Sequence, residues 1–162
     1  MKPGQILDAF EEGVYVLKLV GDVRLTLSLT LERCIRKALQ QHDTQQVVVD
    51  LTEAEGIDST TLGLLAKLSL LAKDQLGWQP VLVYDTTDIY RLLESVGFVD
   101  QVFHPVRQRD LVKAPLKVVE TLECDAETLK QQVLDAHRVL MSLNDDNSES
   151  FRDLVCALEQ QS

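Results

Sequence analysis

Residues 47–68 read VVVDLTEAEGIDSTTLGLLAKL and join two different hydrophobic patterns. QQVVVDL at 45–51 is a short, continuous apolar run, which is typical of a strand covered on both faces. From Asp58 onwards apolar residues recur at helical spacing, and Gly77 stands where a C-terminal helix cap is expected. The stretch therefore predicts a buried strand followed by a helix over 58–77. The apolar helix positions are Leu62, Leu65, Leu68, Leu71 and Ala72.

The same patterns continue on both sides of this stretch. Alternating or continuous apolar runs predict further strands at 14–23, 80–85 and 101–106, with a turn or bulge at Gly21-Asp22. Helical spacing predicts further helices at 30–41, with Thr30 as its N-cap, and at 88–95, capped by Thr87. The order β-β-α-β-α-β-α, with a last edge strand, predicts an α/β domain over 1–107 in which helices cross between neighbouring strands.

Residues 108–162 form a second, acidic unit. Residues 110–162 contain 11 Asp and Glu against 5 Lys and Arg. An amphipathic helix is predicted at 125–144, followed by a polar turn, NDDNSES, in which Ser148 or Ser150 caps a last helix. Two interpretations stay open for this mainly helical extension. Its apolar stripe packs against the α/β domain, or it forms a second docking surface or a homodimer interface.

Composition restricts the partners and the compartment. The formal net charge of −10 argues against nucleic acid or an anionic membrane surface, because both require basic patches. Acidic residues interrupt the N-terminus where a signal peptide needs an apolar run, and no segment approaches the roughly 20 apolar residues of a membrane span. Three scattered cysteines do not indicate a disulfide framework. We therefore expect a cytoplasmic protein.

The sequence offers no catalytic or metal-binding pattern. His42, His104 and His137 lie on separate predicted elements, without partners at metal-ligand spacing. His137 falls on the polar side of its helix pattern and is predicted to be solvent-exposed. Phosphate-cradling glycine motifs and the GxSxG nucleophile motif do not occur. We expect no enzyme activity, no metal and no cofactor.

A cluster of hydroxyl residues, Ser59, Thr60 and Thr61, follows Asp58 where the strand gives way to the helix. Asp and Ser side chains there can cap the first amides of the helix, which have no acceptor within it. A phosphoryl group is the alternative, since it adds roughly −1.5 to −2 charges that a helix N-terminus tolerates. A partner docked over the site would then be repelled.

The segment VVVDLTEAEGIDSTTLGLL resembles the signature of the STAS domain, which anti-sigma factor antagonists share. In that pattern a strand ends in Asp-Leu, and an apolar residue, Asp-Ser and a small residue open an apolar helix. LLESVGFVDQVFHPV is similar to the closing helix and short strand of the family. The resemblance covers roughly residues 10–107. It implies a STAS-like sheet with crossing helices, and leaves the C-terminal extension unaccounted for.

The resemblance implies a phosphoprotein that acts by partner switching in signal transduction and transcription regulation. Ser59 takes the place of the phosphorylated serine and Asp58 that of its orienting acid, with Thr60 and Thr61 as alternative acceptors. Thr61 stands where the family usually has glycine. The implied partners are an anti-sigma factor or GHKL-type serine kinase, bound in the unphosphorylated state, and a PP2C-type phosphatase. The implied docking residues are Asp58, Ser59, Thr60, Thr61 and Leu62.

Two other functions remain open at this point. STAS-like domains also occur as ligand-sensing or scaffold modules that control another regulator, such as a biofilm or motility protein. An enzyme on the same α/β scaffold is a third interpretation, because a fold by itself does not decide function.

Overall fold

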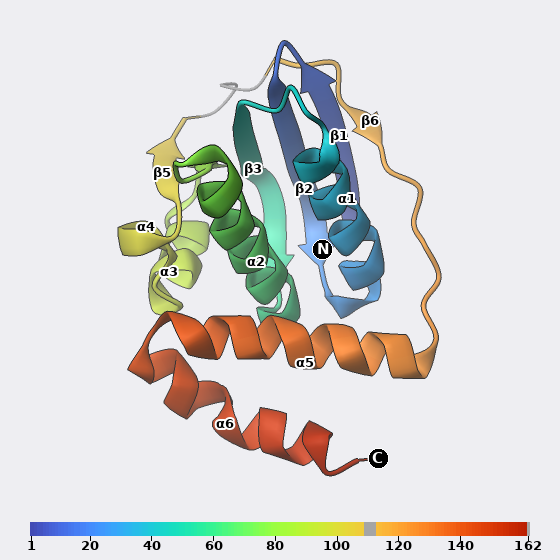
Figure 1. The fold of residues 1–162 in the computed structure, drawn as a ribbon, viewed down its shortest axis with the longest axis vertical. Helices are drawn as coiled ribbons and strands as arrows, with labels where there is room; N and C mark the ends of the chain where they lie inside the picture. The colour runs from blue at the N-terminus through green and yellow to red at the C-terminus, as the bar shows by residue number, and fades with distance from the viewer. Residues whose placement is uncertain (109–112, 162) are drawn as a thin grey trace.

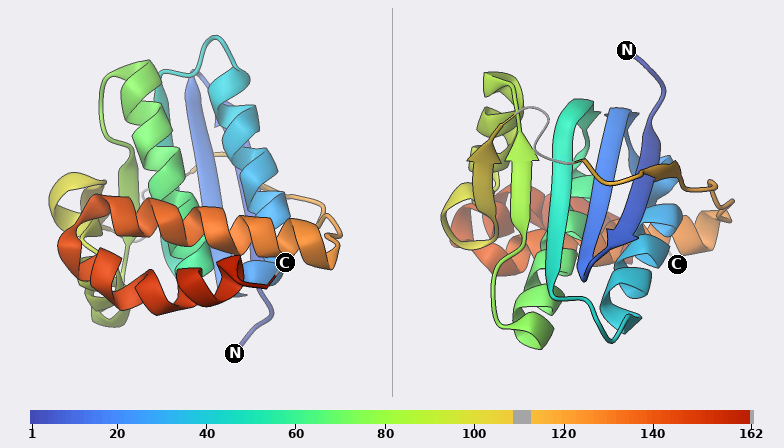
Figure 2. Two further views of the ribbon diagram at one scale, coloured as in Figure 1. Left: turned by 60° about the horizontal axis from the view of Figure 1, so that its bottom comes forward. Right: turned by 90° about the horizontal axis from the view of Figure 1, so that it is seen from above.

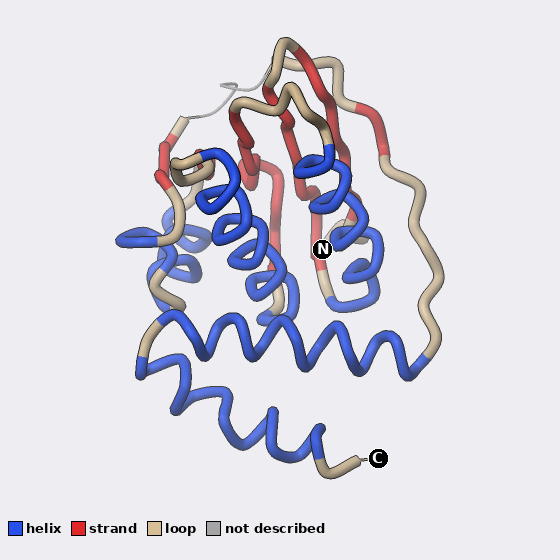
Figure 3. Tube along the Cα trace, in the orientation of Figure 1, coloured by secondary structure: helices blue, strands red, loops and turns tan. Residues whose placement is uncertain are grey.

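The computed structural model describes residues 1–108 and 113–161, and over these residues the strands form one mixed sheet (Figures 1 and 3). The sheet order is β5-β4-β3-β2-β1-β6. Strand β1 is antiparallel to β2 and β6, whereas β2, β3, β4 and β5 are parallel to one another. The strands are β1 (Gln5–Glu11), β2 (Val14–Val23), β3 (Gln46–Ile57), β4 (Val81–Tyr84), β5 (His104–Arg107) and β6 (Lys117–Val118).

Helices connect the parallel strands, as the α/β prediction requires. A 3-10 turn, η1 (Leu25–Leu27), and α1 (Ser28–Gln40) lead from β2 to β3, and α2 leads from β3 to β4. The fold class predicted from the sequence is therefore confirmed. The remaining helices are α2 (Ser59–Leu76), α3 (Thr87–Ser95), α4 (Phe98–Gln101), α5 (Ala126–Leu143) and α6 (Asp145–Glu159).

The strands differ from the predicted ones at their ends. Strand β1 lies in an N-terminal stretch for which the hydrophobic pattern named no strand. Strand β3 continues past residue 51 to Ile57, because its second half pairs with the end of β2. The predicted bulge at Gly21 is confirmed by register shifts in that pairing and by a φ of 75°. Strand β5 begins at residue 104 rather than 101, since Gln101 ends α4.

Three predicted helix caps are wrong. Helix α1 begins at Ser28, so Thr30 lies inside it, and the Thr30 hydroxyl accepts a hydrogen bond from the Leu122 amide at 2.9 Å. Thr86, not Thr87, caps α3. The segment predicted as a polar turn before the last helix is itself helical, with neither Ser148 nor Ser150 as its cap. Helix α6 starts at Asp145. Its N-cap is Asn144, whose side chain accepts a hydrogen bond from the Asn147 amide.

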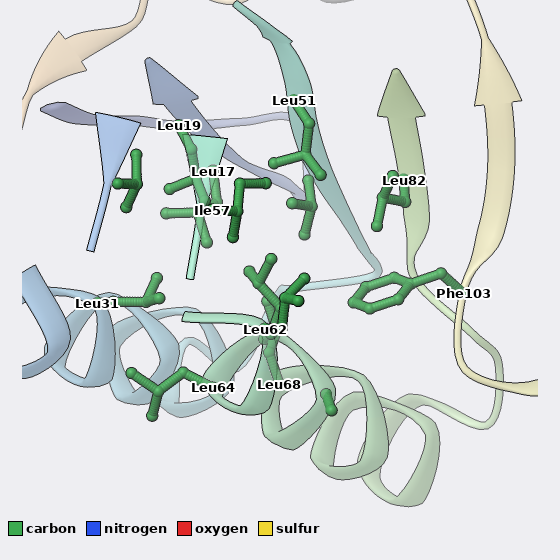
Figure 4. Close-up of a cluster of buried hydrophobic side chains, with 14 of the residues drawn as sticks. Leu17, Leu19, Leu31, Leu51, Ile57, Leu62, Leu64, Leu68, Leu82 and Phe103 are labelled. Atoms are coloured by element: carbon green, nitrogen blue, oxygen red, sulfur yellow. The ribbon is translucent and has the colours of Figure 1, made fainter. Parts of the chain in front are cut away.

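The hydrophobic core lies between the sheet and the two helices α1 and α2. Figure 4 shows leucines of β2 and β3 facing those of α2, with Leu31 of α1 and Phe103 at the sides. Each fully buried leucine stabilises the fold by roughly 1.5–3 kcal/mol. Ala136 and Leu140 of α5 belong to the same buried cluster. The extension therefore packs against the α/β domain, which was the first of its two interpretations.

Helix α5 lies across the ends at which α1 and α2 begin, and α6 folds back beside it (Figures 1 and 2). The chain reaches this position along the edge of the sheet, where β6 pairs with β1. The amide of Val119 also donates to the Ile6 carbonyl at 2.8 Å. Residues 109–112 and 162, which belong to the predicted extension, lie outside the described residues.

The buried hydroxyl of Tyr15 makes the stability of the fold depend on pH in the alkaline range. The hydroxyl donates to Asp8 at 2.7 Å, and burial raises the pKa of Tyr15 above its ordinary value near 10, with Cys34 and Asp8 contributing further. The folded state keeps a proton that the unfolded state releases. Stability is therefore complete below about pH 10, and we expect it to fall above that by up to ~1.4 kcal/mol per pH unit. Urea unfolding from pH 8 to 11 measures this slope, and a slope that is equally steep in Tyr15→Phe contradicts it.

Candidate functional site

The site is built around the N-terminus of α2, and Asp58 positions that end. One carboxylate oxygen of Asp58 accepts from the Thr61 amide at 2.9 Å, and the other accepts from the Leu25 amide at 2.7 Å. The first bond caps α2, and the second ties it to the turn before α1. At the other end Gly77 adopts the left-handed conformation, with a φ of 86°. The helix predicted over 58–77 is confirmed with both of its ends.

The structure separates the three hydroxyl residues. Ser59 is half-buried, and its Oγ lies 2.7 Å from Nε2 of His137, a residue of α5. Thr60 and Thr61 are each only 2% exposed, and the Thr61 hydroxyl faces the Val23 carbonyl at 3.4 Å. Only the Ser59 hydroxyl is therefore near the surface. Because Asp58 uses both oxygens on backbone amides, it caps the helix, while the Ser59 hydroxyl is left for His137.

The remaining predicted docking residue, Leu62, belongs to the hydrophobic core. The predicted docking residues thus meet at one turn of helix, but Thr60, Thr61 and Leu62 face inward. On the face of α2 that carries Ser59, the residues one and two turns further on are Gly63 and Lys67. Gly63 is buried against α5, and Lys67 is half-buried and forms an ion pair with Glu32 of α1 at 2.8 Å.

The prediction that His137 is exposed is wrong, since the residue is 1% exposed. Its Nδ1 lies 2.7 Å from the Val133 carbonyl, which can only accept, so in the neutral ring Nδ1 carries the proton. Nε2 then accepts the hydrogen bond from Ser59. The ring of Phe151 from α6 packs edge-on, with the ring centroids 5.2 Å apart. Helix α2 packs on one side of α5 and α6 packs on the other. More of the α5 surface is therefore buried than its apolar residues alone indicate.

Gly63 allows α2 and α5 to approach very closely. A Cβ at this position would overlap the carbonyl group of Ala136 and would lie 2.7 Å from the Ala136 Cβ. Glycine inside a helix costs about 1 kcal/mol relative to alanine, so its presence in an apolar helical pattern indicates a packing requirement. That signal was available in the sequence, although it does not say which segment packs there.

The pair of Ser59 and His137 combines a hydroxyl with an imidazole that accepts its proton. Such a pair is also the first requirement of a serine nucleophile. Here the other ring nitrogen of His137 bonds a backbone carbonyl, and the close contact at Gly63 fills the space one turn away. The positive end of the α2 dipole and its first amides favour an anion at this position.

The described residues contain no group of three or more His, Cys, Asp or Glu side chains that is arranged to hold a metal ion. Within the same part of the chain, no helix combines the length and apolar character needed to cross a bilayer.

The chain is similar to known proteins at the level of a domain family. The search of curated proteins finds no match. The family model of the STAS domain matches residues 5–110, from the start of β1 to just beyond β5. This match covers more than half of the chain and ends before α5 and α6 begin. With its sheet, its crossing helices and the Asp-Ser turn into α2, the chain belongs to the STAS domain family.

Proposed function

We propose that this protein is a non-catalytic anti-sigma factor antagonist in a partner-switching pathway. In the unphosphorylated state it binds an anti-sigma factor or a GHKL-type serine kinase through the surface at the start of α2. Phosphorylation of Ser59 releases that partner, and a PP2C-type phosphatase restores binding. The observation that carries the proposal is the position of Ser59, whose hydroxyl is half-buried at the first residue of α2, beside a helix cap made by Asp58.

The chemistry of the switch needs only one group on this chain. Transfer of the γ-phosphoryl group of ATP forms a bond from Ser59 Oγ to phosphorus and breaks the bond from phosphorus to the ADP oxygen, and the hydroxyl proton is released. Water reverses the change by hydrolysing the ester to serine and inorganic phosphate. The added charge lies at the favourable end of the α2 dipole, so the STAS fold tolerates it, while a docked partner meets charge and bulk.

Binding accounts for the site better than catalysis does. A hydrolase that used Ser59 and His137 would need room for a substrate beside the hydroxyl, with donors aimed at the developing oxyanion. Here the second ring nitrogen of His137 bonds the Val133 carbonyl instead of an orienting carboxylate, and the Thr61 amide at the helix start already donates to Asp58. We therefore assign Ser59 a regulatory role and no catalytic one.

Paired baits test the proposal. We expect the full chain with Ser59→Ala to retain the partner from a host lysate, and Ser59→Asp to recover at least about tenfold less of it, because like charge at an interface costs ~1.4 kcal/mol or more. Ser150→Asp, which adds the same charge at an exposed position of α6, is the matched control and should bind as the unmodified chain does. Quantitative mass spectrometry gives the recoveries, and urea unfolding shows that each bait is folded. Equal partner lists for the two Ser59 variants would sink the switch at this residue.

A further inference from the structure

The hairpin of α5 and α6 covers the surface that the proposed function assigns to an outside partner (Figures 1 and 2). His137 of α5 bonds to Ser59 at 2.7 Å. In the first turn of α6, the buried side-chain amide of Asn147 donates to the Val96 carbonyl at 3.0 Å and to the Leu140 carbonyl at 2.9 Å. The hairpin is thus fastened to the start of α2 and also to the segment after α3.

The contact at Gly63 excludes any second occupant. The backbone of α5 lies so close to α2 that even one methyl group on Gly63 would overlap the Ala136 carbonyl. No segment of another protein fits between α2 and α5 while this contact is made. An outside helix or loop can therefore reach this part of α2 only where α5 has left it.

The same argument applies to phosphorylation. Oγ of Ser59 and Nε2 of His137 are 2.7 Å apart, which leaves no room between them for a phosphorus atom and its three oxygens. His137 cannot simply turn away, since its other nitrogen is held by the Val133 carbonyl and Phe151 packs against its ring. Phosphoryl transfer to the Ser59 hydroxyl in the position it occupies here thus requires α5 to move.

We infer that the α5–α6 hairpin is an internal occupant of the docking surface, and that an outside partner or kinase gains Ser59 only after the hairpin undocks. The inference deepens the proposed function by naming how its site is regulated. The undocked fraction of the chain then multiplies the intrinsic affinity for the partner. Changes that loosen the hairpin expose Ser59, and changes that tighten it conceal Ser59.

Gly63→Ala in the full chain tests the inference from the α2 side. The new methyl group improves helix propensity in α2 and overlaps only α5 among its nearest neighbours, so the hairpin should lift while the sheet stays intact. We expect amides of residues 126–143 to exchange with solvent at least about tenfold faster, while β2 and β3 keep their protection. Asp74→Ala is the matched control, since it also places alanine in α2 but at an exposed position.

A second readout follows the site itself. In the full chain with Ser59→Cys, the rate at which iodoacetamide alkylates residue 59 reports its access, and peptide mass spectrometry also follows the exposed Cys156 and the buried Cys34 as references. Adding Gly63→Ala should raise the rate at residue 59 about tenfold or more relative to Cys156. If Gly63→Ala fails to fold, Phe151→Ala loosens the hairpin from the α6 side and leaves residues 5–108 unaltered.

Two outcomes overturn the inference: unchanged protection of 126–143 in a folded Gly63→Ala chain, or unchanged access to residue 59 once that protection is lost. Neither measurement uses a partner. Failure of the paired baits in the Gly63→Ala background, in which the hairpin no longer covers Ser59, would therefore reject the proposed function and leave the covering of Ser59 by α5 standing, while unchanged exchange and access would reject that covering alone.

Discussion

Replacing Leu140 with alanine is expected to lower the free energy of unfolding by about 2–5 kcal/mol, although the residue lies outside the segment that matches the STAS domain. Its side chain is 0% exposed and belongs to the same buried cluster as the leucines of α2 and β3. Removal of three carbon groups leaves a cavity between α5 and the domain, and neighbouring elements fill such a cavity only in part. Urea unfolding followed by circular dichroism measures the change.

Leu154→Ala provides the matched control for Leu140. It makes the same chemical change in the same extension, but the Leu154 side chain is 41% exposed. We expect it to change stability by about 0.5 kcal/mol or less, as surface substitutions do. A small effect at both positions would show that the hairpin does not complete the core in solution. It would also argue against the inference that the hairpin covers Ser59.

Lys67→Met is expected to cost about 3 kcal/mol, because it leaves a buried carboxylate without its main partner. Glu32 is 5% exposed, and one of its oxygens lies 2.8 Å from the Lys67 ammonium. Arg36 approaches the same oxygen only at 3.6 Å, from a largely exposed side chain. The other oxygen of Glu32 has no hydrogen-bond partner among the described residues. Methionine keeps an unbranched side chain only one atom shorter than that of lysine, so the loss reflects mainly the charge.

A second substitution separates charge from packing in this test. Glu32→Gln in the Lys67→Met background removes the uncompensated charge, and we expect it to restore most of the lost stability. Lys73→Met, at an exposed position near the end of α2, should have little effect. If the double variant is as unstable as Lys67→Met alone, the loss comes from packing between α1 and α2 and the argument from charge is wrong.

Local signals in the sequence determined much of the fold. Apolar period and length identified β2, the first half of β3 and the helix α2, and the caps Asp58 and Gly77 set the ends of that helix correctly. Such signals act within one or two turns of the chain, so neighbouring residues carry them. The same signals misplaced the caps of α1, α3 and α6, where several hydroxyl or acidic residues stand close together and each one satisfies the local requirement.

The site divides in the same way. The sequence by itself determined the α/β order, the Asp-Ser turn into α2 and the helical character of the extension, because each depends on residues close together in the chain. Only the tertiary structure decided that α5 crosses α2 and that the Thr30 hydroxyl accepts a hydrogen bond from the Leu122 amide. It also decided that His137 is buried against Ser59, 78 residues away in the chain. The type of a polar residue on a helix does not decide whether that residue is buried or exposed. Its environment is set by the elements packed on either side, and no local pattern records which elements those are.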